Sequence, residues 1–310
     1  MLTTITLNPS IDRRYVVDHF QVGNVFRPKH FEATAGGKGL NVARVAQQLG
    51  ESVLTSGFLG EKNGDFILEE LQNKGIHNEF VSIEGQTRNC IAILSENGVQ
   101  TELLEPGPIV TNDEMEQFLQ QYEQILVQSS IIVASGSLPR GIPDDFYYQL
   151  IKKAKAKGVK FLLDTSGTPL KEAIKAAPFL IKPNKSELET LMNCEIKTDE
   201  ELIYHSFKIS RNGIPFVVVS LGSEGAIVIY NEKGYRVKIP KIAAINPVGS
   251  GDSMVAGFAV GLNRNDPIED IIKLGVACGT ANALEMGTGQ IDLDKVSEIL
   301  NYIQIEETKI

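Results

Sequence analysis

Short, continuously apolar segments alternate with amphipathic helical patterns through the middle of the chain. Residues 130–134 and 215–220 carry mainly apolar side chains, as strands buried on both faces of a parallel sheet do. Between such segments, apolar residues recur at helical spacing, for example over 112–127 and 199–211. This alternation predicts a three-layer α/β/α fold with a mostly parallel sheet and helices on both of its faces.

The same signals predict the other elements. Strands are expected at 2–7, 52–58, 130–134, 159–163, 179–181, 215–220, 225–230 and 235–239, with the last hairpin turning at 232–234. Helices are expected at 39–49, 64–74, 112–127, 143–157, 169–176, 185–192, 199–211, 252–262, 267–285 and 292–301. Two regions, approximately 13–35 and 78–105, show extended patterns without a helical period. We expect them to form a separate small β-sheet, made of two insertions into a single domain that spans residues 1–310.

The composition excludes several classes of protein. With 42% hydrophobic and 22% charged residues over 310 positions, the chain can bury a large core and is not intrinsically disordered. A formal net charge of −9 disfavours a protein that tracks nucleic-acid phosphates, so we expect no nucleic-acid partner. An anionic substrate must then be held by a few local cations.

The cysteines and the hydropathy pattern indicate reduced thiols and an aqueous environment. Cys90, Cys194 and Cys278 are widely spaced and form no CxxC pair, so they predict neither a disulfide framework nor a zinc site. No apolar run approaches the roughly 18 residues of a membrane span, and residues 1–12 lack the basic and apolar regions of a signal peptide. We expect a cytoplasmic protein with no membrane partner.

A glycine-rich turn precedes the apolar helix expected at 252–262. Within residues 246–254 (NPVGSGDSM), Gly249 and Gly251 allow a tight turn that points several N–H groups the same way. With the positive end of the helix, such a turn suits a phosphate or a phosphoryl group in transfer. No Lys-Ser/Thr follows, so it is not a P-loop. Taken alone, Asp252 is equally well explained as a helix N-cap.

A second glycine-rich segment, 35–41 (AGGKGLN), opens the helix expected at 39–49. Its glycines permit close approach of the backbone to a ligand, and Lys38 adds a cation beside the N–H groups. Asn41 lies on the first helical turn, where its amide can hydrogen-bond a hydroxyl. The alternative is a plain helix entry with a solvated lysine.

Three further polar segments each follow an expected strand. Asp12 comes after the turn that ends the first strand, where a carboxylate can accept hydrogen bonds from the vicinal hydroxyls of a sugar. Residues 135–139 (SGSLP) and 220–225 (SLGSEG) follow buried strands. Taken singly, the three are explained by an Asx turn, a strand-exit loop and a hairpin turn.

Asn184 and Glu187 follow the strand expected at 179–181 and share a face at the start of a helix. An amide and a carboxylate so placed can orient the waters that Mg²⁺ retains in proteins. The alternative, favoured for this pair alone, is a capping box. Because parallel strands end along one edge of their sheet, all six polar or glycine-rich segments are expected to meet there.

The chain resembles the ribokinase-like PfkB family of carbohydrate kinases over essentially its whole length. Four separated motifs occur in the order of that family: 36–43 (GGKGLNVA), 135–139 (SGSLP), 182–187 (KPNKSE) and 248–253 (VGSGDS). The opening residues 6–12 (TLNPSID) are typical of the branch that contains 1-phosphofructokinases and tagatose-6-phosphate kinases. Pro247, in place of the more usual threonine, leans towards the latter.

The resemblance implies a role for each residue at a matching position. Asp252 matches the catalytic base, and the backbone of Gly249, Ser250 and Gly251 matches its anion hole. The positions that match the sugar and acceptor-phosphate sites are Asp12, Gly37, Lys38, Asn41, Arg88, Ser137 and, in a poorly aligned loop, Arg27. The positions that match the nucleotide site are Lys182, Asn184, Ser220, Gly222, Gly225 and, beside the base, Asn282. Asn184 and Glu187 match a motif associated with Mg²⁺, here expected to act through water.

The resemblance therefore implies an ATP- and Mg²⁺-dependent kinase of a ketohexose monophosphate that forms a 1,6-bisphosphate. K⁺ is an optional further cation, and the small sheet is implied to be a lid and a homodimer contact. Tagatose 6-phosphate is slightly favoured over fructose 1-phosphate. A kinase of a neutral sugar or nucleoside would not need Arg88, and a sugar-phosphate-binding pseudokinase would lack the base or the Mg²⁺ motif. A dehydrogenase is disfavoured because no GxGxxG fingerprint occurs.

Overall fold

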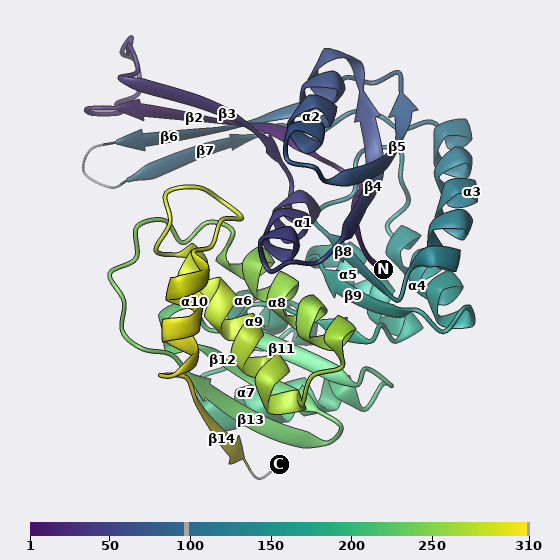
Figure 1. Ribbon diagram of the computed structural model, residues 1–310, viewed down its shortest axis with the longest axis vertical. Coiled ribbons are helices and arrows are strands. Elements are labelled where there is room, and N and C mark those ends of the chain that lie inside the picture. The colour runs from purple at the N-terminus through teal and green to yellow at the C-terminus, as the bar shows by residue number, and fades with distance from the viewer. Residues whose placement is uncertain (96–98, 309–310) are drawn as a thin grey trace.

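Ten strands form one large sheet in the computed structural model, which describes residues 1–95 and 99–308 (Figure 1). These strands are β1 (Leu2–Thr6), β4 (Val53–Gly60), β5 (His77–Ile83), β8 (Ile131–Ser135), β9 (Lys160–Asp164), β10 (Leu180–Ile181), β11 (Phe216–Ser220), β12 (Ala226–Tyr230), β13 (Lys233–Lys238) and β14 (Gln304–Thr308). Their order across the sheet is β14-β13-β12-β11-β10-β9-β8-β1-β4-β5. Neighbours from β11 to β5 pair in parallel, and β12, β13 and β14 extend one edge antiparallel. The predicted mostly parallel sheet is confirmed.

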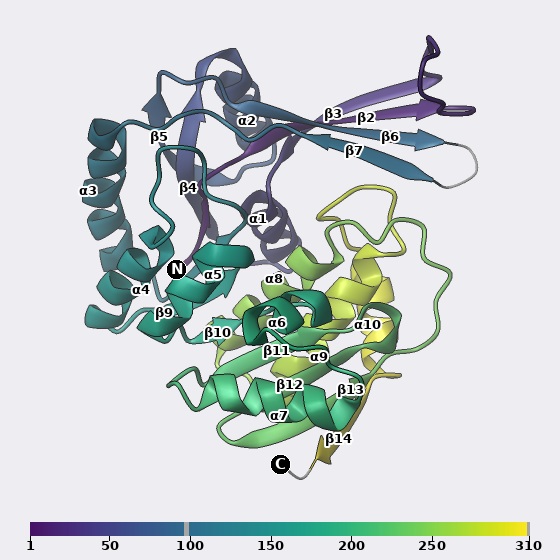
Figure 2. The ribbon, with the colours of Figure 1, turned by 180° about the vertical axis from the view of Figure 1, so that it is seen from behind.

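Helices cover both faces of this sheet (Figures 1 and 2). They are α1 (Lys38–Gln48), α2 (Glu61–Asn73), α3 (Asn112–Gln128), α4 (Phe146–Ala156), α5 (Gly167–Ala173), α6 (Lys185–Met192), α7 (Asp199–Ser210), α8 (Ser250–Arg264), α9 (Ile268–Asn282) and α10 (Leu293–Leu300). Residues of α1, α2, α8, α9 and α10 share one hydrophobic core, and residues of α3 to α7 share the other. None of the helices in the described ranges is long and apolar enough to cross a bilayer.

The continuously apolar strands feed both cores at once. In β11, Phe216 and Val218 pack into the core with α8 and α9, whereas Val217 and Val219 pack into the core with α6 and α7. Successive side chains of a strand point to opposite faces, so a strand covered on both sides needs apolar residues at every position. This requirement explains the continuously apolar sequence of β11.

A second, four-stranded sheet projects from this edge (upper left in Figure 1). Its strands, in spatial order, are β3 (His30–Gly36), β2 (Ser10–Val17), β6 (Arg88–Ser95) and β7 (Gln100–Leu104). The chain enters it directly from β1 and leaves it through Gly37 into α1. The start of the second expected insertion is corrected: residues 77–83 form β5, which pairs in parallel with β4 and buries Val81 and Ile83 in the main core.

Two details at the opposite edge differ from the expectation. The turn between β12 and β13 is formed by Asn231 and Glu232, not by 232–234. A tight two-residue hairpin turn with positive φ at both residues joins the strands here, and the φ angles are 46° and 66°. Strand β14 was not expected, because its glutamates obscure any alternation of apolar and polar residues. It pairs antiparallel with β13 and packs Ile305 against the core.

Candidate active site

The carboxyl ends of the parallel strands open into a cavity of about 1630 Å³ between the large sheet and the small one. The six polar or glycine-rich segments meet there, as the parallel topology predicts. The sequence-predicted residues that line the cavity are Asp12, Gly37, Lys38, Asn41, Arg88, Ser137, Lys182, Asn184, Glu187, Ser220, Gly222, Gly225, Gly249, Ser250, Gly251 and Asp252.

Asp252 lies in the first turn of α8 and is only 6% exposed. Its Oδ2 accepts a hydrogen bond of 2.7 Å from Nδ2 of Asn41, whose own Oδ1 accepts one from Arg44. The other carboxylate oxygen, Oδ1, makes no hydrogen bond with the described residues. The N-cap of α8 is Gly249, so the alternative in which Asp252 is merely a helix cap is excluded. The carboxylate is held firmly by one oxygen and offers the other to the cavity.

The turn before α8 forms an amide nest. Gly249 has φ 83°, and a Cβ there would lie 2.5 Å from Cγ2 of Thr288, so glycine is required on both counts. The N–H of Ser250 is bonded within the turn. Within residues 1–95 and 99–308, the N–H groups of Gly251 and Asp252 have no hydrogen-bond acceptor. They are therefore available to an anion at the positive end of the helix.

A buried carboxylate places two lysines beside this nest. Asp164, the last residue of β9, is 1% exposed, with Oδ1 3.4 Å from Nζ of Lys182 and Oδ2 3.8 Å from Nζ of Lys38. The Lys182 side chain is nearly as buried, and a Cβ at Gly251 would lie 3.1 Å from its Nζ. Lys38, at the first position of α1, stays open to the cavity. The three groups form a charged floor under the nest.

The electrostatics of this cluster favour a carboxylate that can take up a proton. Burial raises the pKa of Asp252 to about 6; Lys38 opposes the rise and Asp164 adds to it. Burial would also raise the pKa of Asp164, but Lys182 and Lys38 outweigh it and keep that pKa below its ordinary value. Asp164 in turn raises the pKa of Lys38. At neutral pH Asp164 and Lys38 are charged, and Asp252 titrates close to the working range of a general base.

Asp12 lies across the cavity, on β2 of the small sheet. Its Oδ1 accepts a 2.7 Å hydrogen bond from Oγ of Ser10. A Cβ at Gly36 would lie 2.1 Å from the Asp12 carboxyl carbon, so β3 must carry glycine opposite this side chain. Burial raises the pKa of Asp12. The carboxylate is thus fixed against the sheet, with room for hydroxyl groups on its cavity side.

Arg88 begins β6 and is held by main-chain acceptors. Its Nη1 donates to the Glu105 carbonyl at 2.8 Å and its Nη2 to the Asn8 carbonyl at 3.0 Å. The Asn8 side chain donates to Oγ of Ser137 at 3.1 Å. These bonds connect the end of β1, the loop after β8 and the small sheet. They hold the Arg88 guanidinium in place at this end of the cavity.

Asn184 and Glu187 form the capping box at the start of α6. The Asn184 Oδ1 accepts from the Glu187 N–H, and the Glu187 Oε2 accepts from the Asn184 N–H, both at 2.8 Å. The capping interpretation is therefore correct, and both residues also line the cavity. Ser220, bridged to Asn184, brings in the loop that carries Gly222 and Gly225.

Two predicted site residues lie outside the cavity lining. Arg27 is exposed in the connection between β2 and β3. Asn282 is fully buried: its Oδ1 accepts from Oγ of Ser253 and the N–H of Gly289, and its Nδ2 donates to the Val248 carbonyl. The Asn282 amide ties the turn before α8 to the segment after α9, and its contact with a nucleotide base stays a prediction.

Sequence reasoning missed Asp164 and Arg44. Asp164 stands one position beyond the strand expected at 159–163, where the strand-end rule applies, but no glycine marks the site. Arg44 is 7% exposed inside the apolar face of α1, three residues after Asn41. A charged residue within an apolar helical stripe is the signal that could have found it.

The comparisons with known proteins agree with this geometry. The model of the pfkB family carbohydrate kinases matches residues 6–295, and the chain belongs to this family. A tagatose-6-phosphate kinase from Staphylococcus epidermidis is 44% identical over 310 residues, covering 99% of this chain and 100% of that protein. Phosphofructokinase-2 from Escherichia coli in complex with potassium superposes with a TM-score of 0.92 at 30% identity, over 97% of this chain and 98% of that one. The same enzyme with fructose 6-phosphate gives 0.87 at 30% identity, with the same coverage.

Proposed function

We propose that this protein transfers the γ-phosphoryl group of ATP to a primary hydroxyl of a ketohexose monophosphate, forming a 1,6-bisphosphate. Tagatose 6-phosphate is the favoured acceptor over fructose 1-phosphate, in keeping with the name of the 44% identical relative. The observation that carries the proposal is the juxtaposition of Asp252 Oδ1, the two unpaired N–H groups at Gly251 and Asp252, and the lysine pair around Asp164, all in one cavity with Asp12.

The residues at the carboxyl edge of the large sheet supply the groups needed for phosphoryl transfer. Asp252 accepts the proton of the acceptor hydroxyl as the oxygen attacks phosphorus. The free N–H groups of the nest, with Lys38 and Lys182, offset the negative charge that spreads over the transferred group. Each such preorganised donor is typically worth about 3 kcal/mol in the transition state. Asn41 orients the base by its hydrogen bond to Oδ2.

The small sheet and its neighbours supply the acceptor site. The Asp12 carboxylate and the nearby Gly37 backbone suit the hydroxyl groups of a sugar, while Arg88 and Ser137 suit the phosphate that the acceptor already carries. Since the chain is acidic overall, a local cation such as Arg88 must provide the attraction for this phosphate. Arg27 is exposed in the connection between β2 and β3 and remains a candidate only as a contact from outside the cavity.

The remaining lining residues suit a metal-bound nucleotide. Ser220, Gly222 and Gly225 lie on the wall beside Lys182. Glu187 Oε1 makes no hydrogen bond within the described part of the chain, so Asn184 and Glu187 can hold the waters of Mg²⁺. When bound, Mg²⁺ neutralises phosphate charge. Among the described residues no three His, Cys, Asp or Glu side chains form a metal cage, which fits an ion held mainly by water and phosphates.

Three further expectations stay predictions. K⁺ is an optional further cation. The small sheet can be the contact of a homodimer, since Phe31, Leu103 and Leu104 give it exposed apolar surface. A cytoplasmic location is proposed from the cysteine spacing and the hydropathy pattern of the sequence.

A coupled assay of ADP release over several acceptors tests the proposed function. The acceptors are tagatose 6-phosphate, fructose 1-phosphate, fructose 6-phosphate, ribose and adenosine. We expect turnover with one or more of the three phosphates, and the highest kcat/KM with tagatose 6-phosphate. Preference for ribose or adenosine would replace the proposal with a neutral-acceptor kinase, and binding of sugar phosphate without turnover would replace it with a regulator.

A further inference from the structure

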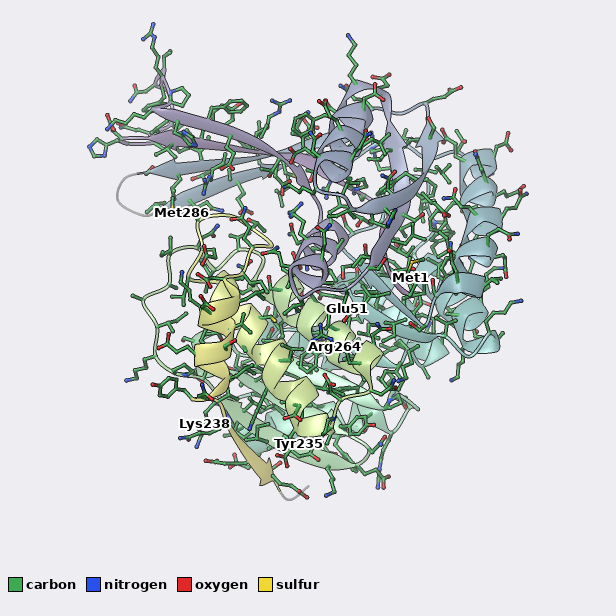
Figure 3. The ribbon with its side chains drawn as sticks, viewed as in Figure 1. Met1, Glu51, Tyr235, Lys238, Arg264 and Met286 are labelled. Carbon is green, nitrogen blue, oxygen red and sulfur yellow. The ribbon has the colours of Figure 1, made fainter. Side chains whose placement is uncertain are left out.

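One arginine of the small sheet reaches across the cavity mouth. Nη1 of Arg14, on β2, donates a 2.8 Å hydrogen bond to the carbonyl of Met286, which lies between α9 and α10. Its Nη2 binds Glu32 on β3 at 2.6 Å. Figure 3 labels Met286 where the segment after α9 approaches the underside of the small sheet. The contact joins residues that are 272 positions apart.

The segment that receives Arg14 also supports the catalytic wall. The Met286 carbonyl accepts a second hydrogen bond, of 3.1 Å, from Nδ2 of Asn246, whose Oδ1 accepts from the Val248 N–H in the turn before α8. Two residues further on, Thr288 packs against Gly249 of the nest. Segment 286–290 therefore contacts both the small sheet and the nest.

The same segment meets the group that orients the base. The Thr288 carbonyl accepts from Arg44 at 3.4 Å, and Arg44 in turn holds Asn41. A Cβ at Gly289 would lie 2.9 Å from Cα of Asn41, so the two backbones touch. A displacement of 286–290 would thus be felt at Asn41, and through it at Asp252.

Arg14 differs from Arg88 in having a carboxylate partner. Glu32 neutralises the charge of Arg14, whereas main-chain carbonyls hold Arg88 and leave its charge available to an anion.

We propose that Arg14 is a positioning residue that fastens the small sheet to segment 286–290 and so keeps Asp12 at a fixed position relative to Asp252 and the nest. The proposal rests on the proposed function, because this relative position matters when an acceptor held by one wall must meet a phosphoryl group held by the other. Without the fastening, water can take the acceptor's place: the γ-phosphoryl group passes to water, giving ADP, inorganic phosphate and a proton.

The test substitutes Arg14 and follows both coupling and local order. For Arg14→Ala we expect kcat for bisphosphate formation to fall roughly tenfold, as for a lost charge-assisted hydrogen bond. We expect KM for ATP to stay unchanged and the ratio of ADP to bisphosphate to rise above that of the parent. Deuterium uptake in segment 284–290 should increase in the absence of any substrate. Arg14→Lys should recover part of the loss, since one ammonium can reach Glu32 or the Met286 carbonyl but not both.

Arg264→Ala is the matched control. Arg264 makes the same kind of long-range bridge outside the cavity, with Nε to the Glu51 carboxylate at 2.8 Å and Nη2 to the Leu49 carbonyl at 2.6 Å. Figure 3 labels Arg264 and Glu51 between α8 and the end of α1. This variant should alter exchange near those helices and leave kcat and coupling as in the parent.

The outcomes separate the two proposals. Unchanged uptake in 284–290 on Arg14→Ala overturns the fastening, whatever the reaction is. A raised KM for the acceptor alone, with kcat and coupling intact, overturns it in favour of direct contact between Arg14 and the acceptor phosphate. If the parent protein phosphorylates none of the acceptors, the proposed function fails, while the exchange experiment still decides the role of Arg14.

Discussion

The two walls of the cavity differ in how they hold their charges. On the wall formed by the large sheet, Asp164 and Asp252 are 1% and 6% exposed, and each is surrounded by fixed partners. On the wall formed by the small sheet, most residues of β2 and β6 are only half-buried, and β7 is largely exposed.

This difference separates the chemistry from the selection of the substrate. Charges enclosed by protein interact strongly, because little water screens them, whereas charges on a half-open sheet are screened. The large-sheet wall is therefore suited to stabilising a transition state, and the small-sheet wall to recognising the acceptor. Substitutions of ligand-facing residues on the first wall should act mainly on kcat, and those on the second mainly on KM. Arg14 is the exception, because it acts through segment 286–290 and not on the acceptor.

The largest effect is expected for Asp252→Asn. The amide keeps the size of the side chain but cannot accept the hydroxyl proton, so kcat should fall by about 10³-fold, within the range for loss of a general base. ATP binding, measured by calorimetry, should be unchanged, because the nest and the lysines remain. Turnover close to that of the parent would refute Asp252 as the base.

A smaller effect, on the other parameter, is expected for Arg88→Ala. Loss of a charged hydrogen bond to the acceptor phosphate should raise KM for the sugar phosphate roughly 30-fold, about 2 kcal/mol. Steady-state kinetics should show a much smaller change in kcat. An acceptor without a phosphate provides the control, because its KM should not respond. An unchanged KM for the sugar phosphate would remove Arg88 from acceptor recognition.

The sequence was sufficient to locate the catalytic wall because that wall follows from topology. Parallel strands end along one edge, so loops after them must meet, and glycine marks those where the backbone approaches a ligand. The nest at Gly249 and the loop of Asn184 were located in this way. Asp164 was missed because its importance comes from two lysines on other elements, a partnership that no spacing along the chain reveals.

The small sheet was harder to predict for a related reason. Residues 77–83 have the same short β pattern as the strands that follow, and only their pairing with β4 assigns them to the large sheet. The sequence also did not reveal that Arg27 lies on an exposed connection or that the amide of Asn282 is buried and bonded to protein groups. Half-buried strands are specified by partners distant in sequence, and their side-chain roles follow from that pairing.

The smallest effect concerns pH, and it tests whether the two walls are electrically separate. Because Asp252 must be ionised to accept a proton and its pKa is raised to about 6, kcat/KM should rise with pH up to about 6 and then level off. Asp164→Asn removes a negative neighbour and frees Lys38 and Lys182 to interact with Asp252. Both changes lower the pKa of Asp252, so the rising part of the pH profile of kcat/KM, here called the acid limb, should move to lower pH by about one unit or less.

Asp164→Asn also leaves the enclosed Lys182 ammonium without its carboxylate, which costs about 3 kcal/mol of stability. Urea unfolding curves must therefore accompany the pH profile, to show that the variant is folded at each pH measured. Arg88→Ala is the control from the opposite wall, and its acid limb should coincide with that of the parent although its KM has changed. If the rising part of the profile also moved in Arg88→Ala, the charges of both walls would act on Asp252. If it moved to higher pH in Asp164→Asn, the influence assigned to Asp164 and the two lysines would be wrong.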